Sequence, residues 1–258
     1  MLHRPRLIPC LLLSDGNLVK SQKFKDPNYL GDPINAVKIF SEKCVDELCI
    51  QDIEASKKGR GPDFALLEDM ASEAFMPLSY GGGITTLDQA ARLFHIGFEK
   101  VILNTSFIDR PDLVTRISKR FGAQSVVVSI DVKQDLLRRY RCFTADGTRP
   151  AGGDPLALAL RAQELGAGEI LLNSIDRDGM MQGYDLRLIR SLSQALDVPL
   201  IACGGAGGVS DLEKALHEGG AHAVAAGSMF VYFGKLKAVL INVPDEQALY
   251  ESGVYQRK

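Results

Sequence analysis

Apolar residues gather in short runs along the whole chain, and segments with helical spacing of apolar positions separate these runs. Runs rich in Val, Ile and Leu are typical of parallel strands buried on both faces, whereas a period of 3.6 residues indicates an amphipathic helix. The pattern predicts eight strands, at Arg6–Leu13, Glu47–Asp52, Pro77–Tyr80, Lys100–Leu103, Ser125–Val132, Glu169–Asn173, Pro199–Ala202 and His222–Ala226.

The segments between these strands begin with residues that commonly cap helices. An Asp, Ser or Thr side chain accepts hydrogen bonds from free amides of the first turn, and proline is tolerated at the first helical position. Several of the segments also end at glycine, as helices often do. The predicted helix starts are Asp32-Pro33, Thr86, Asp109, Asp154-Pro155 and Ser210.

Eight strand-then-helix units in 258 residues predict a (β/α)8 TIM barrel that forms a single domain over residues 1–258. The alternative is a doubly wound open sheet, which usually has fewer strands and a single glycine-rich loop. The two halves of the chain also match at an offset of 122 residues, since Glu47 corresponds to Glu169 and Ser106 to Ser228. An internal half-barrel repeat of this kind predicts equivalent sites in the two halves.

Composition and charge exclude several classes of protein. The net charge of −2 and the dispersed Lys and Arg residues argue against nucleic acid as a partner. No apolar run approaches the roughly 20 residues that a membrane helix needs, so we expect no membrane association. The five cysteines form no CxxC pair, which favours a reducing, cytoplasmic location. The four histidines lack the spacing of metal ligands, and we predict neither a metal nor a cofactor.

Each half carries a pattern typical of phosphate binding after two of its strands. Glycines let the backbone approach an anion, and hydroxyl and amide groups supply hydrogen-bond donors. A single such loop is usually only a turn, but two copies after barrel strands favour two phosphate sites at the carboxyl ends of the strands. The predicted residues are Gly82, Gly83, Asn104 and Thr105 in the first half, and Gly205, Gly207, Gly227 and Ser228 in the second.

Several motifs together resemble the cyclase subunit of imidazole glycerol phosphate synthase over nearly the whole chain. They include "YGGGIT", "VVVSIDVK", "IACGGAG" and, most specifically, "NSIDRDGMMQGYD". The resemblance implies a glutaminase-like partner that releases ammonia, a barrel that conducts it, and a small-molecule substrate with two phosphates. It also implies that Lys20 contacts a phosphate and that Asp178 and Gly179 belong to the catalytic face.

Cyclisation in the family that the chain resembles depends on one Asp at the end of strand one and another at the end of strand five. Asp131 matches the second position, whereas Leu12 falls on the first. Asp15 is the nearest other acid, but it has the opposite strand parity to Leu12 and precedes the turn residue Gly16. Loss of one general acid or base typically costs about 10²–10⁴ in rate. We therefore expect efficient cyclisation to be lost, with Asp131 as the remaining catalytic residue.

The substitution at Leu12 points to a paralogous branch. The stretches "EAFMPLSYGGGIT" and "AAGSMFVYFGKLKAVLINVP" resemble proteins of acetamidino-sugar formation in lipopolysaccharide or O-antigen biosynthesis. That resemblance implies that ammonia passes to a separate ATP-dependent sugar amidotransferase. The alternative is the cyclase subunit of histidine biosynthesis, whose two-phosphate substrate suits the two predicted phosphate sites better than a nucleotide sugar does. Two interpretations therefore stay open: an enzyme that uses Asp131, or a module that only conducts ammonia.

Charged residues open four of the predicted strands, at the end of the barrel where interiors are ordinarily filled by branched apolar side chains. Arg6, Glu47, Lys100 and Glu169 include both signs and would either form a ring across the barrel floor or be ordinary surface charges. In the family that the chain resembles, the matching positions form the salt-bridged entrance of the ammonia channel. The resemblance therefore favours an ammonia gate, with the glutaminase-like partner bound to this face.

Overall fold

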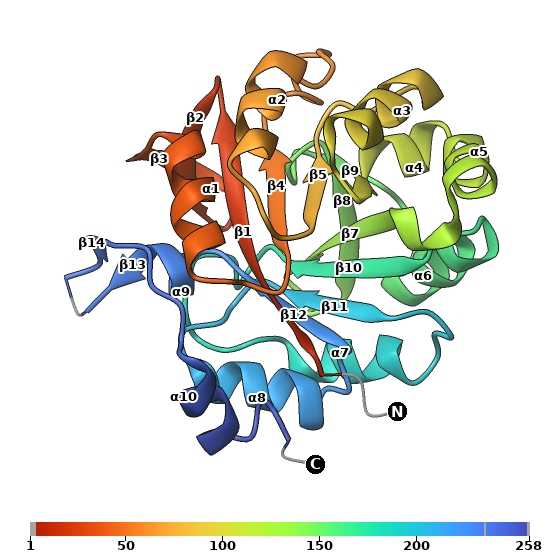
Figure 1. Ribbon diagram of the computed structural model, residues 1–258. Helices are drawn as coiled ribbons and strands as arrows, with labels where there is room; N and C mark the ends of the chain where they lie inside the picture. The colour runs from red at the N-terminus through yellow and green to blue at the C-terminus, as the bar shows by residue number, and fades with distance from the viewer. Residues whose placement is uncertain (1–3, 235, 257–258) are drawn as a thin grey trace.

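Eight parallel strands close into a barrel in the computed structural model, which describes residues 4–234 and 236–256 (Figure 1). Each strand pairs with its neighbours in chain order, and β10 closes the circle by pairing with β7 from Glu169↔Val127 to Ser174↔Val132. The prediction of a (β/α)8 TIM barrel is confirmed. The barrel strands are β1 (Arg6–Ser14), β4 (Leu48–Asp52), β5 (Leu78–Gly81), β6 (Lys100–Leu103), β7 (Val126–Gln134), β10 (Glu169–Ser174), β11 (Leu200–Cys203) and β12 (Ala223–Ala226).

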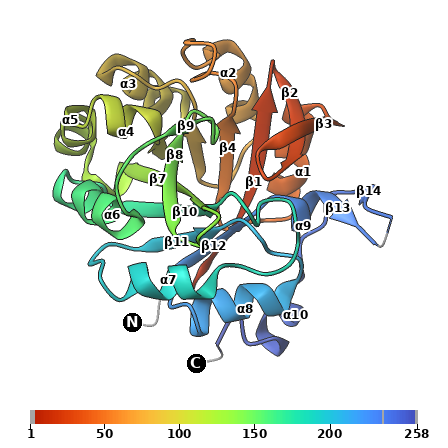
Figure 2. The same cartoon turned by 180° about the vertical axis from the view of Figure 1, so that it is seen from behind.

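Helices surround the barrel and follow its strands (Figures 1 and 2). The predicted caps Asp32, Thr86 and Asp154 are confirmed, because each side chain accepts hydrogen bonds from amides of the first turn. Three further helices begin in the same way, at Asp63, Asp185 and Asp245, which sequence analysis did not single out. The helices are α1 (Pro33–Glu42), α2 (Phe64–Ser72), α3 (Leu87–Ile96), α4 (Thr105–Asp109), α5 (Asp112–Phe121), α6 (Pro155–Glu164), α7 (Leu186–Ser193), α8 (Val209–His217), α9 (Ser228–Val231) and α10 (Glu246–Glu251), with a 3-10 turn at Ala123–Ser125.

Two predicted helix starts were wrong. Asp109 ends the short helix α4 instead of beginning α5, and its carboxylate pairs with Arg149 at 2.8 Å. Ser210 lies inside the first turn of α8, which begins at Val209 without a side-chain cap. In both places a polar residue resembles a cap in sequence, but tertiary contacts or the preceding loop fix the actual start of the helix.

Hairpins extend two barrel strands beyond the carboxyl end of the barrel. Strand β1 continues into β2 (Asn17–Gln22) and β3 (Lys25–Gly31), and β7 continues into β8 (Tyr140–Thr144) and β9 (Arg149–Pro150). The strands β1 and β7 begin the two halves of the chain, so the hairpins occupy equivalent places in the internal repeat. A third hairpin, β13 (Tyr232–Phe233) with β14 (Ala238–Val239), follows α9 and projects from the barrel (Figure 1).

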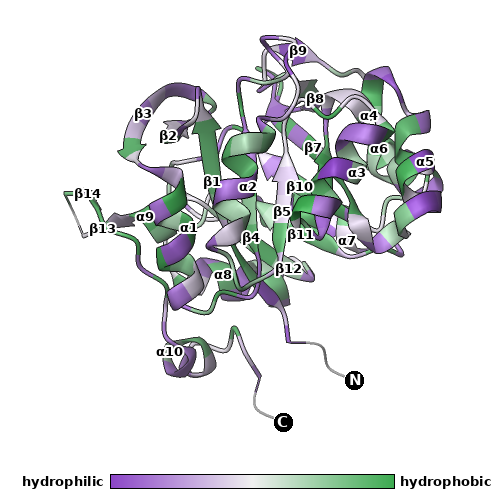
Figure 3. Cartoon of the chain, turned by 45° about the horizontal axis from the view of Figure 1, so that its top comes forward, coloured by the Kyte–Doolittle hydropathy of each residue, from purple (hydrophilic) through white to green (hydrophobic). Residues whose placement is uncertain are grey.

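The buried side chains form two groups, one between the strands and the helices and one inside the barrel. The outer group is large, and Figure 3 shows hydrophobic strands behind helices whose surfaces carry polar residues. The inner group combines branched aliphatic side chains with small cysteine and alanine side chains, and part of the barrel interior stays empty. Its members are Ile8, Cys10, Cys49, Ile102, Val127, Leu171, Ile201, Cys203, Ala223 and Ala225.

No helix among the described residues combines the length and apolar character needed to span a bilayer.

Candidate functional site

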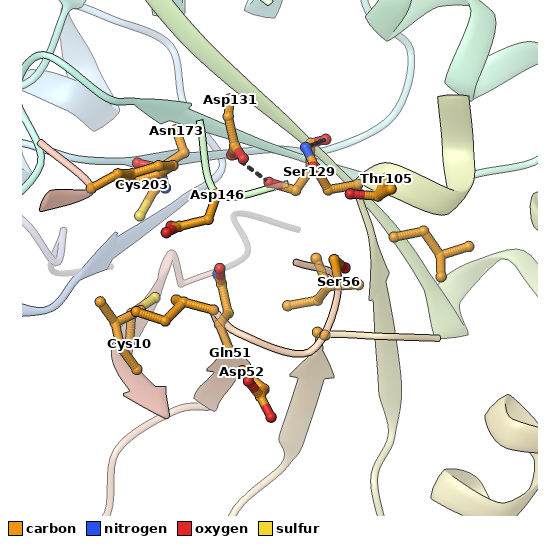
Figure 4. Close-up of a pocket in the computed structure, with 18 of the residues that line it drawn as sticks. Cys10, Gln51, Asp52, Ser56, Thr105, Ser129, Asp131, Asp146, Asn173 and Cys203 are labelled. Carbon is orange, nitrogen blue, oxygen red and sulfur yellow. Dashed lines mark hydrogen bonds between the residues drawn. The ribbon is translucent and has the colours of Figure 1, made fainter. Parts of the chain in front are cut away.

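A pocket of about 900 Å³ opens at the carboxyl ends of the barrel strands, where barrel active sites lie (Figure 4). It brings together eight of the twelve catalytic-face residues predicted from the sequence: Lys20, Gly82, Gly83, Asn104, Thr105, Asp131, Asp178 and Gly227. The other four, Gly179, Gly205, Gly207 and Ser228, do not line this pocket. Of these, Gly207 borders a neighbouring hollow beside Met181 and Tyr232.

Asp131 is the most chemically exceptional group of the pocket. Strand β7 points its side chain inward, where it is buried and accepts a hydrogen bond of 3.0 Å from the Ser129 hydroxyl (Figure 4). No Lys, Arg or His of residues 4–234 and 236–256 forms an ion pair with it. Burial raises the pKa of Asp131 to about 7, assisted by the charges of Asp146 and Asp178, while the Ser129 hydroxyl opposes the rise. A carboxyl group with such a pKa can both donate and accept a proton near neutral pH.

The pocket wall at the end of β1 is neutral. Leu12 lines the pocket beside Gln51 of β4, its direct partner in the strand register. Asp15 does not replace the missing acid, because it is exposed and pairs with Lys58 at 2.6 Å. The lysine partner lowers the pKa of Asp15, so this carboxylate stays ionised on the surface.

Asp52 at the end of β4 is a structural carboxylate. Its Oδ1 accepts hydrogen bonds of 2.9 Å from the amides of Glu54 and Ala55, and Arg60 pairs with it at 3.2 Å. Although Asp52 lines the pocket, its carboxylate points away from Asp131 in Figure 4. These contacts shape the loop after β4 and leave Asp52 poorly placed for proton transfer.

Lys20 and Asp178 form a buried ion pair of 3.1 Å. Lys20 stands on β2, whereas Asp178 follows β10, so the pair ties the first hairpin to the loop after the sixth barrel strand. Gly179 lets this hairpin approach closely, because a side chain there would collide with the carbonyl of Ser21. Both charged residues line the pocket, and a phosphate entering it would compete with Asp178 for Lys20.

The first glycine-rich loop lies against the pocket with little space to spare. Gly82 and Gly83 have φ of 134° and 64°, and side chains there would strike Asp52 and Arg60. Thr105 accepts a hydrogen bond of 3.1 Å from the amide of Ala145, which anchors the turn between β8 and β9.

Some backbone groups of the second glycine-rich loop already form hydrogen bonds within the chain. The carbonyl of Gly205 accepts a hydrogen bond of 2.9 Å from the amide of Gly183, and the Gly207 amide donates to Asp211 at 2.8 Å. The hydroxyl of Ser228, by contrast, is buried and has no hydrogen-bond partner among the described residues. A buried hydroxyl without a partner is costly, and an anion or water at this place would satisfy it.

The four charged residues at the barrel floor form a closed ring. Arg6 contacts Glu47 at 2.5 Å and Glu169 at 2.7 Å, while Lys100 contacts the same two residues at 2.8 and 3.1 Å. Their side chains range from 3% exposed for Glu47 to 27% for Arg6, so the ring is largely shielded from solvent. The alternative of four separate surface charges is therefore excluded by the geometry.

A small cavity lies inside the barrel and borders the charged ring. Glu47 belongs both to its lining and to the ring. Cys49 and Ser79 form part of its wall, and Ile102 lines both this inner cavity and the upper pocket. Ring, inner cavity and upper pocket thus follow one another along the barrel interior.

Comparison with known proteins assigns the chain to a family. A family model described as "Histidine biosynthesis protein" matches residues 6–237. A protein of Leptospira interrogans, named as a candidate HisF subunit of imidazole glycerol phosphate synthase, is 49% identical over 251 residues, covering 96% of this chain and 99% of its own. The chain belongs to the HisF-like family.

Two further relatives bear names of additional HisF copies. A candidate subunit named hisF2 from Pseudomonas aeruginosa is 49% identical over 246 residues, covering 95% of this chain and 98% of the relative. A candidate hisF3 from Vibrio vulnificus is 48% identical over 242 residues, with 93% of both chains covered. The names describe those proteins as subunits of imidazole glycerol phosphate synthase.

Sequence analysis did not predict three residues of the pocket in this HisF-like chain. Asn173 lies near the end of β10, is buried, and leaves its Oδ1 without a partner among the described residues. Gln51 precedes the last residue of β4 and faces the pocket, and Asp146 enters the pocket from the turn between β8 and β9 (Figure 4). The Asp146-Gly147 pair was a usable signal for a turn, but nothing in the sequence placed that turn above the barrel.

The raised pKa of Asp131 predicts that the HisF-like fold loses stability with rising pH. The folded pKa of about 7 lies above the ordinary value of roughly 4, so the contribution is fully present below about pH 4 and is lost as pH rises through about 7. At pH 8 we expect the free energy of unfolding of Asp131→Asn to exceed that of the native chain by up to roughly 4 kcal/mol, and at pH 4 we expect no such gain. Denaturant unfolding at the two pH values provides the measurement. Equal stability differences at both pH values would contradict the expected titration.

Proposed function

We propose that this HisF-like chain is the ammonia-using synthase subunit of a glutamine amidotransferase. Ammonia from a glutaminase-like partner on the amino-terminal face enters through the ring of Arg6, Glu47, Lys100 and Glu169 and reaches the pocket at Asp131. The observation that carries this proposal is that the charged ring, the inner cavity and the upper pocket follow one another inside the barrel. Glu47 belongs to both the ring and the inner cavity, and Ile102 lines both the inner cavity and the upper pocket.

The walls of the interior suit a small neutral molecule. The inner cavity is lined mainly by apolar side chains and the Ser79 hydroxyl, and it is closed from below by the charged ring. Ammonia is small and uncharged, whereas ammonium would have to leave water without a compensating partner in this apolar section. An ion-paired floor would open only when a bound partner rearranges its contacts.

The absence of the strand-one acid supports a reaction other than efficient cyclisation. The pocket keeps Asp131 and replaces the partner position by Leu12, with the amide of Gln51 beside it. We propose acetamidino-sugar formation in lipopolysaccharide or O-antigen biosynthesis as the physiological role. In this role ammonia reaches a nucleotide-activated acetamido sugar with the help of an ATP-dependent sugar amidotransferase.

A second candidate is the cyclase reaction of histidine biosynthesis. It is favoured by the predicted anion-binding residues at the pocket, since Gly82 and Gly83 lie against one side of it and Gly227 lines another. A substrate phosphorylated at both ends would use both groups of residues, as its two phosphates lie far apart.

Reconstitution distinguishes the two candidates. The chain is combined with a glutaminase-like partner, glutamine, ATP and an ATP-dependent sugar amidotransferase, and a nucleotide-activated acetamido sugar is added. We expect mass spectrometry to show that the acetamido oxygen of the sugar is replaced by an imino nitrogen, and we expect this product to form only when the chain is present. Efficient conversion of the two-phosphate histidine precursor, with no sugar product, would instead establish the second candidate.

We further expect the face at the carboxyl ends of the barrel strands to bind two inorganic phosphate or sulfate ions. One should lie at Gly82, Gly83 and Thr105, and the other near Gly227 and Ser228, because the Ser228 hydroxyl lacks a partner. Crystals grown without these anions and then soaked in sulfate provide the measurement. Replacing Ser228 with alanine should empty the second site alone, whereas density at neither site in the native crystal would contradict the prediction.

A further inference from the structure

We propose that Asp146 supplies the second carboxylate of this active site and acts as the base while Asp131 acts as the acid. The inference rests on the proposed use of ammonia in this pocket. It assigns the chemistry lost at Leu12 to a residue from a different element, the turn between β8 and β9. Ammonia would add to a carbonyl carbon of the substrate between these two carboxyl groups.

Several contacts hold Asp146 over the barrel. Its backbone and those of its neighbours Ala145 and Gly147 have φ of 54°, 49° and 73°, which turns the chain back sharply toward the pocket. The Ala145 amide donates to the Thr105 hydroxyl at 3.1 Å, and Lys57 pairs with the Asp146 carboxylate at 2.5 Å. The side chain is only 9% exposed and points into the pocket (Figure 4).

The other acids of the pocket are less suited to carry a proton. Four aspartates line it, and Asp52 is held by two backbone amides and Arg60. Lys20 lies within 3.3 Å of both oxygens of Asp178. The remaining two are Asp131, which contacts a hydroxyl, and Asp146, which contacts one lysine. Only these two combine a position in the pocket with limited ties to the surrounding chain.

The surroundings of the two carboxyl groups separate their roles. Burial raises the pKa of Asp146 to about 6, assisted by Glu54 and Asp178, while Lys57 opposes the rise. Asp131 has a higher pKa, about 7, because it is fully enclosed and lacks a cation. The cation at Lys57 favours the ionised form of Asp146, whereas Asp131 has only the Ser129 hydroxyl as a partner among the described residues, and this difference in contacts assigns the base to Asp146 and the acid to Asp131.

An unpartnered amide oxygen points to a ligand between these groups. Asn173 lies on β10 opposite Asp131 in the strand register, and its Oδ1 is buried in the pocket wall without a partner in the part of the chain that the structure describes. An acceptor at this place fits an N–H group, such as one of ammonia. Asn173 would hold the nucleophile near Asp131 and Asp146.

The proton transfers balance in a single addition step. The nitrogen lone pair of ammonia forms the new C–N bond, and the π electrons of the substrate C=O move to its oxygen. That oxygen takes the proton of Asp131, and the positively charged nitrogen gives one proton to Asp146. The product carries –OH and –NH2 on the former carbonyl carbon, Asp131 is left ionised and Asp146 protonated.

Four variants test the role of Asp146 with ammonium salts and the two-phosphate histidine precursor: the native chain, D146N, L12D and L12D/D146N. The native chain should show weak turnover, which D146N lowers by about 10²-fold. L12D carries a substitute carboxyl group, so adding D146N to it should have a much smaller effect. E54Q is the matched control, because Glu54 contacts Lys57 at 3.6 Å but does not line the pocket.

The outcomes separate this inference from the proposed function. Equal losses in both backgrounds would overturn the inference, because a structural role of Asp146 affects both alike. The inference would also be overturned if L12D turned over the precursor while the native chain did not. If neither the native chain nor L12D turns over this precursor, the precursor is not a substrate and the cyclase candidate fails, and carboxyl-carbon NMR then decides the role of Asp146. Titration of Asp146 near pH 6, shifted by D131N, supports the inference, whereas titration near an ordinary aspartate value overturns it.

Discussion

Replacing Leu12 with aspartate is expected to raise ammonia-dependent cyclase turnover by about 10²-fold or more over the native chain. The native pocket presents an apolar side chain at the end of β1, so one side of a bound precursor faces no proton carrier there. The new carboxyl group would stand across the pocket from Asp131, next to Gln51. Turnover is measured with free ammonia, so that the result does not depend on the glutaminase partner.

Leu12→Asn is the matched control for this experiment, because it has the shape and polarity of aspartate but carries no exchangeable acid proton. A gain in L12D that is absent in the asparagine variant would attribute the effect to proton transfer. Efficient cyclisation by the native chain would contradict the expectation. It would show that the carboxyl groups already in the pocket are sufficient.

Replacing Glu47 with alanine is expected to abolish coupling between glutamine hydrolysis and synthesis and to destabilise the fold by about 3–5 kcal/mol. Glu47 is almost fully buried and contacts both Arg6 and Lys100, so its removal leaves two cations facing a single carboxylate, Glu169. The measurements are denaturant unfolding, and turnover with glutamine compared with turnover with ammonium salts in the complex with the partner.

Glu99→Ala is the control for Glu47→Ala. Glu99 precedes Lys100 at the same end of the barrel, is exposed, and forms no ion pair in the part of the chain that the structure describes. Its removal should change neither stability nor coupling measurably. Unchanged use of glutamine in the Glu47 variant, with the complex intact, would rule out the ring as an ammonia gate.

The sequence by itself determined the barrel and the position of its charged floor. Eight apolar runs each end close to where the observed strands end, because strands buried on both faces need nearly continuous apolar residues. The floor charges could be located because they stand at the first residues of such runs, and closed barrels bring strand starts together at one face. Asp131 was singled out because it matches a catalytic position of the family that the chain resembles.

Tertiary structure alone decided which polar groups are available for chemistry. Asp52 and Asp131 both lie toward the carboxyl ends of predicted strands and look equivalent in sequence, but backbone amides and Arg60 hold the first while the second is buried without a cation among the described residues. The Lys20–Asp178 pair joins residues 158 positions apart, and no local pattern encodes such a contact. Asp146 reads as an ordinary turn residue, and it enters the pocket only because the β8–β9 hairpin folds back across the barrel, where burial and Lys57 set its charge.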